Sequence, residues 1–213
     1  MNTFDRLVEL FRSFPGIGPR QARRFVFFLL NRDGAFPGEL VKLIGALRKE
    51  VAQCKECFRF FGKRGAIPLC SICADRNRDD SQLMIVATDT DLDAIEKSGV
   101  YHGRYFVLGG TLPLLEKRTK TSPRLKELTI VIERRLHPRV PASSHPRESA
   151  ALKEVILGLS ANPEGEHTSD ELRKCLSPFA LKITALGRGL STGSELEYAD
   201  AQTLKSALKN RTP

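Results

Sequence analysis

Hydrophobic and polar positions follow a helical period through the first quarter of the chain. Apolar residues from Phe4 to Phe14 recur every three or four positions, so they share one face of a helix. Residues 15–19 hold two prolines and two glycines and interrupt the pattern, which resumes over 20–30. A third helix is expected over 38–53. The N-terminal part is therefore predicted to be helical throughout.

The period changes beyond residue 80. Four runs of strand length are apolar at nearly every position, namely 83–87, 105–108, 155–159 and 181–186. Helical patterns separate them, one over 92–97 and one that is expected to start near Thr168 or Ser169. Strands that are apolar throughout and alternate with helices indicate a mostly parallel sheet covered on both faces. The predicted fold class is therefore α/β, with flanking helices.

The segment 111–150 is ambiguous. Ser122 and Pro123 are typical of an N-cap followed by a first helical residue. Leu125, Leu128, Ile132 and Leu136 would then share one face, which favours a helix. The β-branched run 129–132 leaves a strand as the alternative. Residues 137–149 contain three prolines and two adjacent serines, which indicates a loop.

Charge adds a candidate partner to this picture. The formal net charge is +9, and basic residues concentrate in 1–52 and 117–147, whereas 81–116 is acidic. Basic patches attract polyanions because each neutralised phosphate releases counterions. No apolar run is long enough to cross a bilayer, and the first residues lack the pattern of a secretory signal. We therefore expect a cytoplasmic, nucleoid-associated protein with no membrane partner and reduced thiols.

The most specific motif is a pair of CxxC sequences separated by twelve residues. Two such pairs can place four thiolates at the corners of a tetrahedron, as a structural Zn²⁺ requires. Four protein ligands leave no open position, so one structural zinc per chain is predicted rather than a catalytic metal. A disulfide pair is the alternative, and Cys175, which stands alone, is interpreted as a small buried hydrophobic residue. The predicted ligands are Cys54, Cys57, Cys70 and Cys73.

The second motif is the glycine-containing break between the first two helices. Two glycines at 16 and 18 allow a tight hairpin with exposed backbone N–H groups, and the following helix N-terminus favours an anion. This is typical of a helix-hairpin-helix element that contacts the DNA backbone without sequence preference. The alternative is an ordinary corner between helices. The candidate DNA-binding residues are Gly16, Gly18, Arg20, Arg23 and Arg24.

Acidic residues follow two of the expected strands. Asp89 and Asp91 come just after the first, where carboxylates can hold Mg²⁺ for phosphoryl transfer. We favour the alternative that they cap a helix, because no second cluster completes a catalytic set. Glu164 and Glu166 follow the third strand, where they could bind a metal or a basic partner, or cap a helix.

The order of these motifs resembles the recombination mediator family RecR. Two segments resemble the first half of that family's Toprim domain, a third its second acidic motif, and a fourth its C-terminal signature. These segments are 94–99 with 103–108, 162–168, and 193–200 with 203–208. The resemblance implies four modules: a helix-hairpin-helix module over 1–53, a zinc finger over 54–76, a Toprim-like domain over 80–187 and a C-terminal segment over 188–213.

The chain also departs from the family pattern. Ala87 stands where Toprim domains place a glutamate after the first strand, and the second acidic motif is two residues shorter. Residues 111–150 do not follow the pattern, with an apparent insertion near 137–149, and Ser191 replaces a proline. The lost glutamate makes Toprim catalysis less favoured.

The resemblance implies a non-catalytic DNA-binding scaffold of recombinational repair of damaged DNA. It further implies a homo-oligomer, either a dimer or a ring-like tetramer. Partnership with RecO and RecF would help to load recombinase onto single-stranded DNA, and Glu164 and Glu166 would face RecO. The alternatives are a Mg²⁺-dependent Toprim nuclease or phosphatase, and a monomeric zinc-finger module.

Overall fold

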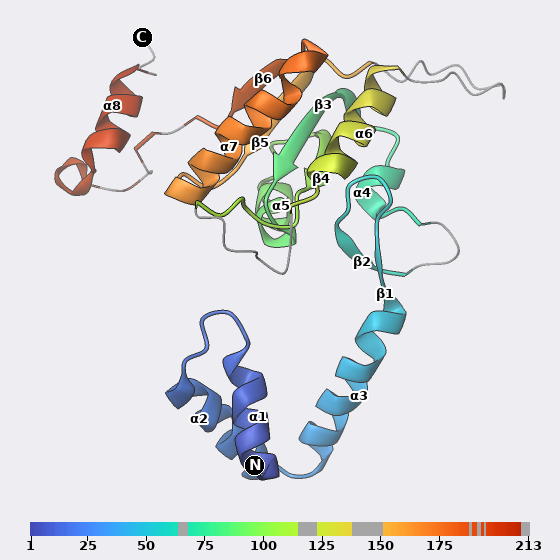
Figure 1. Cartoon of the computed structure of the whole chain (residues 1–213), viewed down its shortest axis with the longest axis vertical. Coiled ribbons are helices and arrows are strands. Elements are labelled where there is room, and N and C mark those ends of the chain that lie inside the picture. Colours follow the sequence, from blue (N-terminus) through green and yellow to red (C-terminus); the bar gives the residue numbers. More distant parts are fainter. Residues whose placement is uncertain are drawn as a thin grey trace. The chain divides into compact units, whose positions relative to one another are not determined.

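The computed structural model of the chain describes residues 1–63, 68–114, 123–137, 151–187, 189, 190, 193 and 195–209 (Figure 1). Its elements, in chain order, are α1 Thr3–Arg12, α2 Pro19–Leu30, α3 Ala35–Glu50, β1 Val51–Gln53, β2 Phe60–Gly62, α4 Ser71–Ala74, β3 Asp79–Val86, α5 Asp89–Ser98, β4 Gly103–Val107, α6 Leu125–Leu136, β5 Glu154–Gly158, α7 Pro163–Leu176, η1 Ser177–Phe179, β6 Lys182–Ala185, η2 Leu196–Tyr198 and α8 Ala201–Lys209.

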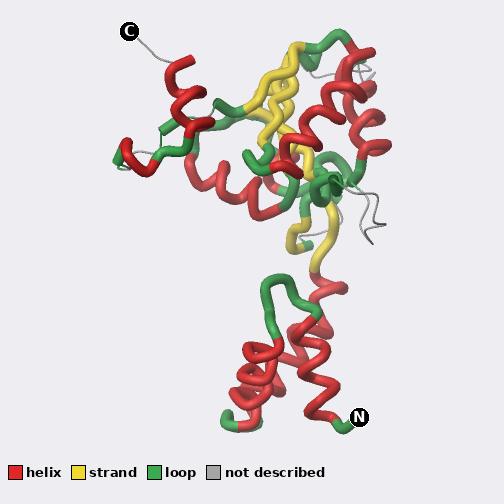
Figure 2. Tube along the Cα trace, turned by 60° about the vertical axis from the view of Figure 1, so that its left-hand side comes forward, coloured by secondary structure: helices red, strands yellow, loops and turns green. Residues whose placement is uncertain are grey.

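The described chain divides into two compact units. One contains Met1–Ala52 together with Gly62 and Lys63, and the other contains Gln53–Phe61 and the described chain from Pro68 onward. The boundary passes through the two-stranded sheet of β1 and β2. Figure 2 shows that the first unit consists mainly of helices, whereas the four-stranded sheet belongs to the second. No helix among the described residues is both long and apolar enough to span a membrane.

The first unit contains a small core between α1 and α2. Val8 from α1 is buried against Ala22 and Val26 from α2, as the helical periodicity predicted, and Phe4, Leu7, Phe11 and Ile17 pack around them. The third helix differs from the prediction. It begins at Ala35 and ends at Glu50, because the chain turns extended at Val51 and pairs with β2.

The second unit is built on a parallel sheet with the strand order β4-β3-β5-β6. Every neighbouring pair is parallel, so the predicted sheet is confirmed. The apolar runs of the sequence coincide with buried positions: residues 83–86 of β3 are buried, as are all residues of β4, whereas β3 begins with four polar residues that are exposed or half-buried. Parallel pairing also brings the carboxyl ends of all four strands to one edge of the sheet.

Alternate residues of β3 enter two different cores. Leu83 and Ile85 pack with residues of α6 and α7, which lie on one side of the sheet (Figure 1). Met84 and Val86 pack on the other side with Leu92 of α5 and with the cysteine-bearing segment. The cysteine-bearing segment is therefore continuous with the core of the sheet and forms part of one covering layer.

Two helix starts differ from the sequence-based expectation. Residues 125–136 do form a helix, with Leu128 and Ile132 buried, but it begins at Leu125 and its N-cap position is Arg124. Ser122, the expected cap, lies outside the described residues, as does most of the loop expected over 137–149. The helix expected near Thr168 begins at Pro163, because Asn162 accepts a hydrogen bond from the backbone N–H of Gly165 at 2.8 Å.

Candidate metal centre and nucleic-acid interface

The two CxxC pairs come together in the second unit. All four sulfur atoms lie within 4.8 Å of one another, and the Sγ atoms of Cys57 and Cys70 are 3.6 Å apart. A tetrahedron with Zn–S bonds of about 2.3 Å has sulfur–sulfur edges of roughly 3.8 Å, so the donor set fits this ion. Among the residues that the structure describes, no other cluster of ligand side chains has this geometry.

The backbone around the thiols supports ligation. The N–H of Cys73 points to the Sγ of Cys70, and the N–H of Cys70 points to the Sγ of Cys54, each at 3.5 Å. Such donors stabilise thiolates, which carry negative charge. Phe58 follows the first pair with a left-handed backbone, φ 62°, and its ring packs on Phe106 at 5.2 Å between centroids. This packing offsets the strain of a conformation that non-glycine residues rarely adopt.

The thiols influence one another strongly. Hydrogen bonds from Cys57, Cys70 and Cys73 hold the pKa of the Cys54 thiol far below its usual value. The same hydrogen bond with Cys54 raises the pKa of the Cys57 thiol far above it. A bound cation requires four thiolates, so metal binding releases the remaining protons.

Cys175 differs from its interpretation as a buried residue. It lies in α7 and is half-buried, because it occupies a position between the buried Leu172 and Leu176 on one side and the exposed face on the other.

The aspartates after β3 have structural partners. Thr88 and Asp91 form a capping box at the start of α5, which is the helix-capping alternative favoured by the sequence. Asp89 accepts a hydrogen bond from the backbone N–H of Phe60 at 2.8 Å. Asp93 pairs with Arg59 at 3.0 Å. Two of these carboxylates therefore attach the cysteine-bearing segment to α5.

Glu164 and Glu166 lie in the first turn of α7, at the carboxyl edge of the sheet. Glu164 is exposed and accepts a hydrogen bond from the hydroxyl of Thr111 at 3.1 Å, whereas Glu166 is half-buried. Gly165 between them approaches the carbonyl of Ser160 so closely that an added Cβ would overlap that oxygen. The position of both glutamates is therefore fixed by a turn that only glycine permits.

The hairpin of the first unit presents the start of α2 without a side-chain cap. Gly16 has φ 75°, which favours glycine, and Gly18 is the N-cap residue. Pro19 occupies the first turn and no acidic residue does. The first N–H groups of a helix have no acceptor within the helix, so those of Gly18, Arg20 and Gln21 remain available to an anion. In α1, by contrast, Asn2 fills this role.

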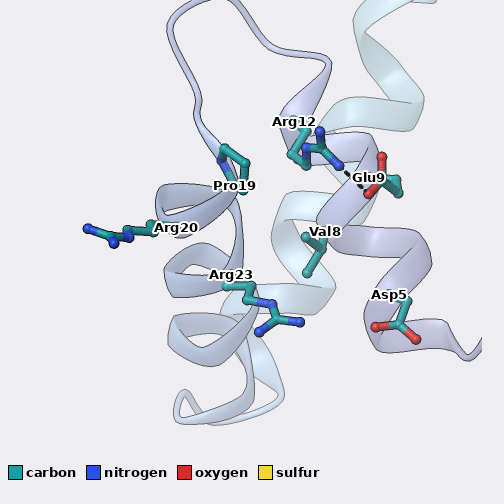
Figure 3. A pocket seen from close by; sticks show the side chains of 7 residues that line it. All are labelled: Asp5, Val8, Glu9, Arg12, Pro19, Arg20 and Arg23. Atoms are coloured by element: carbon teal, nitrogen blue, oxygen red, sulfur yellow. Dashed lines mark hydrogen bonds and ion pairs between the residues drawn. The ribbon is translucent and has the colours of Figure 1, made fainter.

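The three candidate arginines are exposed on α2, and Arg20 and Arg23 point in different directions. The side chain of Arg20 points away from α1, whereas that of Arg23 points toward it (Figure 3). A groove of about 310 Å³ lies between the two helices, and its lining residues are Asp5, Val8, Glu9, Arg12, Pro19, Arg20 and Arg23.

Sequence reasoning missed the acidic wall of this groove. Asp5 and Glu9 lie on α1 one turn apart, and Glu9 pairs with Arg12 at 2.6 Å. The spacing of four residues between Asp5 and Glu9, and of three between Glu9 and Arg12, indicated that these side chains share one face of α1. Nothing in the sequence indicated that Arg23 faces them. The acidic wall distinguishes Arg23 from Arg20 electrostatically.

Comparisons with known proteins agree with this arrangement. A family model described as RecR, helix-hairpin-helix, matches residues 4–49, one described as Toprim domain matches residues 81–187, and one described as RecR, C-terminal, matches residues 189–212. Recombination protein RecR of Roseiflexus sp. (strain RS-1) is 37% identical over 206 residues, which cover 97% of this chain and 91% of the relative. The protein of the same name from Synechococcus sp. (strain CC9605) is 36% identical over 208 residues, with 98% of each chain covered.

A helical hairpin segment, a four-cysteine site and a Toprim domain in this order define a class of recombination proteins. The chain belongs to the RecR family. The membership confirms the resemblance found in the sequence and the predicted fold, a Toprim-like parallel sheet preceded by a helix-hairpin-helix region and a cysteine cluster.

Proposed function

We propose that this protein is a non-catalytic DNA-binding scaffold of recombinational repair, stabilised by one zinc ion per chain. The observation that carries the proposal is the uncapped start of α2 beside a glycine hairpin and exposed arginines. Backbone N–H groups and the helix dipole would hold a phosphate, with Arg20 and Arg24 adding charge. Such contacts position a protein on the DNA backbone and carry no sequence information.

The metal proposal rests on donor chemistry. Four sulfur ligands suit Zn²⁺, which would be held by Cys54, Cys57, Cys70 and Cys73 and would stabilise this segment of the fold. A site with four protein ligands leaves no position for a reacting water, so its role is structural. Elemental analysis of purified protein tests the proposal, with one zinc per chain as the expected result.

The absence of catalysis is supported by the carboxyl edge of the sheet. Asp89, Asp91 and Asp93 each make contacts within the protein, so their presence after β3 is explained without a Mg²⁺ ion. Ala87, where a glutamate would stand, is buried and its carbonyl accepts the N–H groups of two glycines. The alternative, a nuclease or phosphatase, predicts Mg²⁺-dependent cleavage that Asp89→Ala abolishes.

We further propose that the protein acts with RecO and RecF to help load recombinase onto single-stranded DNA. Glu164 and Glu166 would face RecO, because their position at the carboxyl edge of a parallel sheet is where partners of α/β proteins commonly bind. Replacing both glutamates by lysine should weaken RecO binding in calorimetry while leaving the fold intact. The melting temperature should fall modestly, because Glu164 loses its hydrogen bond with Thr111 and α7 loses the acidic residues of its first turn. Reversal of Glu171 and Asp170, on the same helix, provides the matched control, and equal binding by all three proteins would contradict the assignment.

Assembly completes the proposal. A dimer or a ring-like tetramer would combine many weak phosphate contacts, so modest local affinity would suffice to hold DNA. Each of the four modules would have one role in this assembly. The module over 1–53 would contact DNA, and the one over 54–76 would provide a metal-stabilised connection. The domain over 80–187 would provide the partner surface, and residues 188–213 would form the C-terminal segment. Light scattering after size-exclusion chromatography distinguishes this assembly from a monomeric DNA-binding module.

A further inference from the structure

The edge strand β4 contacts both halves of the four-cysteine site. The backbone N–H of Val107 donates to the carbonyl of Cys57 at 2.8 Å, which holds the first CxxC turn. The side chain of Arg104, three residues earlier, donates through Nη1 to the carbonyls of Ile72 at 2.9 Å and Cys73 at 3.2 Å, which belong to the second turn. One strand therefore fixes the two turns relative to each other.

Arg104 is itself held firmly. It is only 8% exposed, and its Nε donates to Oδ1 of Asp80 in β3 at 2.7 Å. Asp80 also lies 3.8 Å from Arg135 of α6, so the carboxylate is anchored from a second element. Because Nε is committed to Asp80, the planar guanidinium has one orientation, and in that orientation Nη1 points to the turn that carries Cys73.

We infer that Arg104 is a positioning residue for the metal site, an inference that rests on the proposed zinc. Its charge-assisted hydrogen bonds to two adjacent carbonyls hold the second turn in the conformation that brings Cys70 and Cys73 toward Cys54 and Cys57. The sheet thus prepares the site for the metal, so less conformational entropy is lost when the ion binds.

A second arginine, Arg78, separates this role from general stabilisation. It is half-buried, pairs with Glu96 and donates to the carbonyls of Tyr101 and Gly103, so it resembles Arg104 in its bonding. None of the carbonyls that it binds belongs to a CxxC turn. Loss of Arg78 should destabilise the second unit without a specific effect on metal binding.

The test measures zinc transfer from the full-length, zinc-loaded protein to a chromogenic chelator. Removing a group that orients metal ligands commonly lowers metal affinity by about 10-fold to 100-fold. Since Arg104 acts through backbone carbonyls, Arg104→Gln should lower zinc affinity by about 10-fold, at the lower end. Arg104→Lys should recover part of this loss, because an ammonium can reach one carbonyl but cannot also bind Asp80 in the same fork. Arg78→Gln is the matched control.

The absorption spectrum of the Co²⁺-substituted protein provides a second measurement. A distorted second turn should shift its sulfur-to-cobalt bands in Arg104→Gln and leave them unchanged in Arg78→Gln. If Arg104→Gln does not fold, Asp80→Asn takes its place in the test. This variant keeps the arginine but weakens its bond with residue 80, so a smaller loss of zinc affinity is expected than for loss of Arg104 itself.

The inference is overturned if Arg104→Gln binds zinc as tightly as the wild type. If Arg104→Gln does not fold, wild-type zinc affinity in a folded Asp80→Asn protein overturns it instead. An equal loss of affinity in Arg78→Gln would also overturn it. Wild-type protein that contains no zinc and takes up none when it is added would instead refute the metal proposal itself.

Discussion

The most direct test of the DNA-binding proposal removes two positive charges beside the start of α2. Arg20 and Arg24 are four residues apart on an exposed helix, so both can be replaced by alanine without disturbing the core formed by Val8, Ala22 and Val26. Alanine also has the highest helix propensity, so α2 should persist. The double variant should keep its zinc and its assembly.

The expected effect follows from counterion release. Each phosphate neutralised on duplex DNA contributes about 0.9 to the slope of log affinity against log salt, so loss of two contacts should flatten the slope by up to about 1.8 per bound subunit. Over a fourfold rise in salt this corresponds to roughly a 10-fold smaller loss of affinity than in the wild type. The N–H groups of the hairpin remain, so some binding should persist.

Fluorescence anisotropy over a salt series measures the slope, with duplexes of unrelated sequence and equal length. The matched control replaces Arg48 and Lys49 by alanine. Both residues are exposed in the last turn of α3, so this replacement removes the same amount of charge from the same unit. Arg23→Ala should have a smaller effect than Arg20→Ala, since Arg23 points toward the acidic side of the groove.

One result would refute the reasoning. If the Arg20→Ala/Arg24→Ala protein keeps the wild-type slope while neutralising Lys117, Arg118 and Lys120 lowers it, the basic stretch beyond β4 binds the DNA and the hairpin does not. If the control variant flattens the slope as much as the double variant does, the effect comes from the lower net charge and not from the position of Arg20 and Arg24.

Three further predictions concern the second unit. Cys57→Ser should retain less than one zinc per chain and melt at a lower temperature, because a structural metal contributes to folding; full zinc by elemental analysis would contradict this. Asp89→Ala should lower the unfolding free energy by about 1 kcal/mol in urea titrations, since the N–H of Phe60 loses its acceptor, and wild-type stability would argue against that contact. Burial raises the pKa of Glu96, but its hydrogen bonds with Arg78 outweigh burial and leave the pKa below its usual value. The pair therefore stabilises the fold fully above about pH 4.5 and less as the pH falls through the folded-state pKa, so the melting temperature of Glu96→Gln should depend less on pH below about 4.5.

The order and type of the main elements were accessible from the sequence because each is encoded locally. Helical periodicity located α1, α2 and α6, and the apolar runs located the parallel strands. The start of α7 was placed five residues too late, because its cap, Asn162, follows the strand almost directly and the acidic residues after it obscure the helical period. The end of α3 was also missed, because pairing between β1 and β2 depends on a partner outside the local window.

The candidate sites, like the elements of the fold, have features that local sequence encodes and features that depend on residues far away in the chain. Ligand spacing within a motif is local, so the four cysteines could be grouped from the sequence alone. What supports the motif is not local: Arg104 meets Cys73 from 31 residues away and Asp89 meets Phe60 from 29. No property of an isolated arginine or aspartate distinguishes a residue that holds a metal-binding turn from one on a solvated surface.

The acidic residues after β3 illustrate why this distinction matters for function. In the sequence, Asp89 and Asp91 at the end of a parallel strand were compatible with both phosphoryl transfer and helix capping. In the folded chain, Asp91 caps α5 and Asp89 binds the backbone of β2, next to the cysteine turns. Asp89 accepts the N–H of Phe60 through Oδ1, and this bond holds the carboxylate in one orientation beside the cysteine-bearing segment. The contacts of Asp89 and Asp91 therefore account for both side chains without a metal ion, and for Asp91 the folded chain shows the helix-capping role that the sequence favoured.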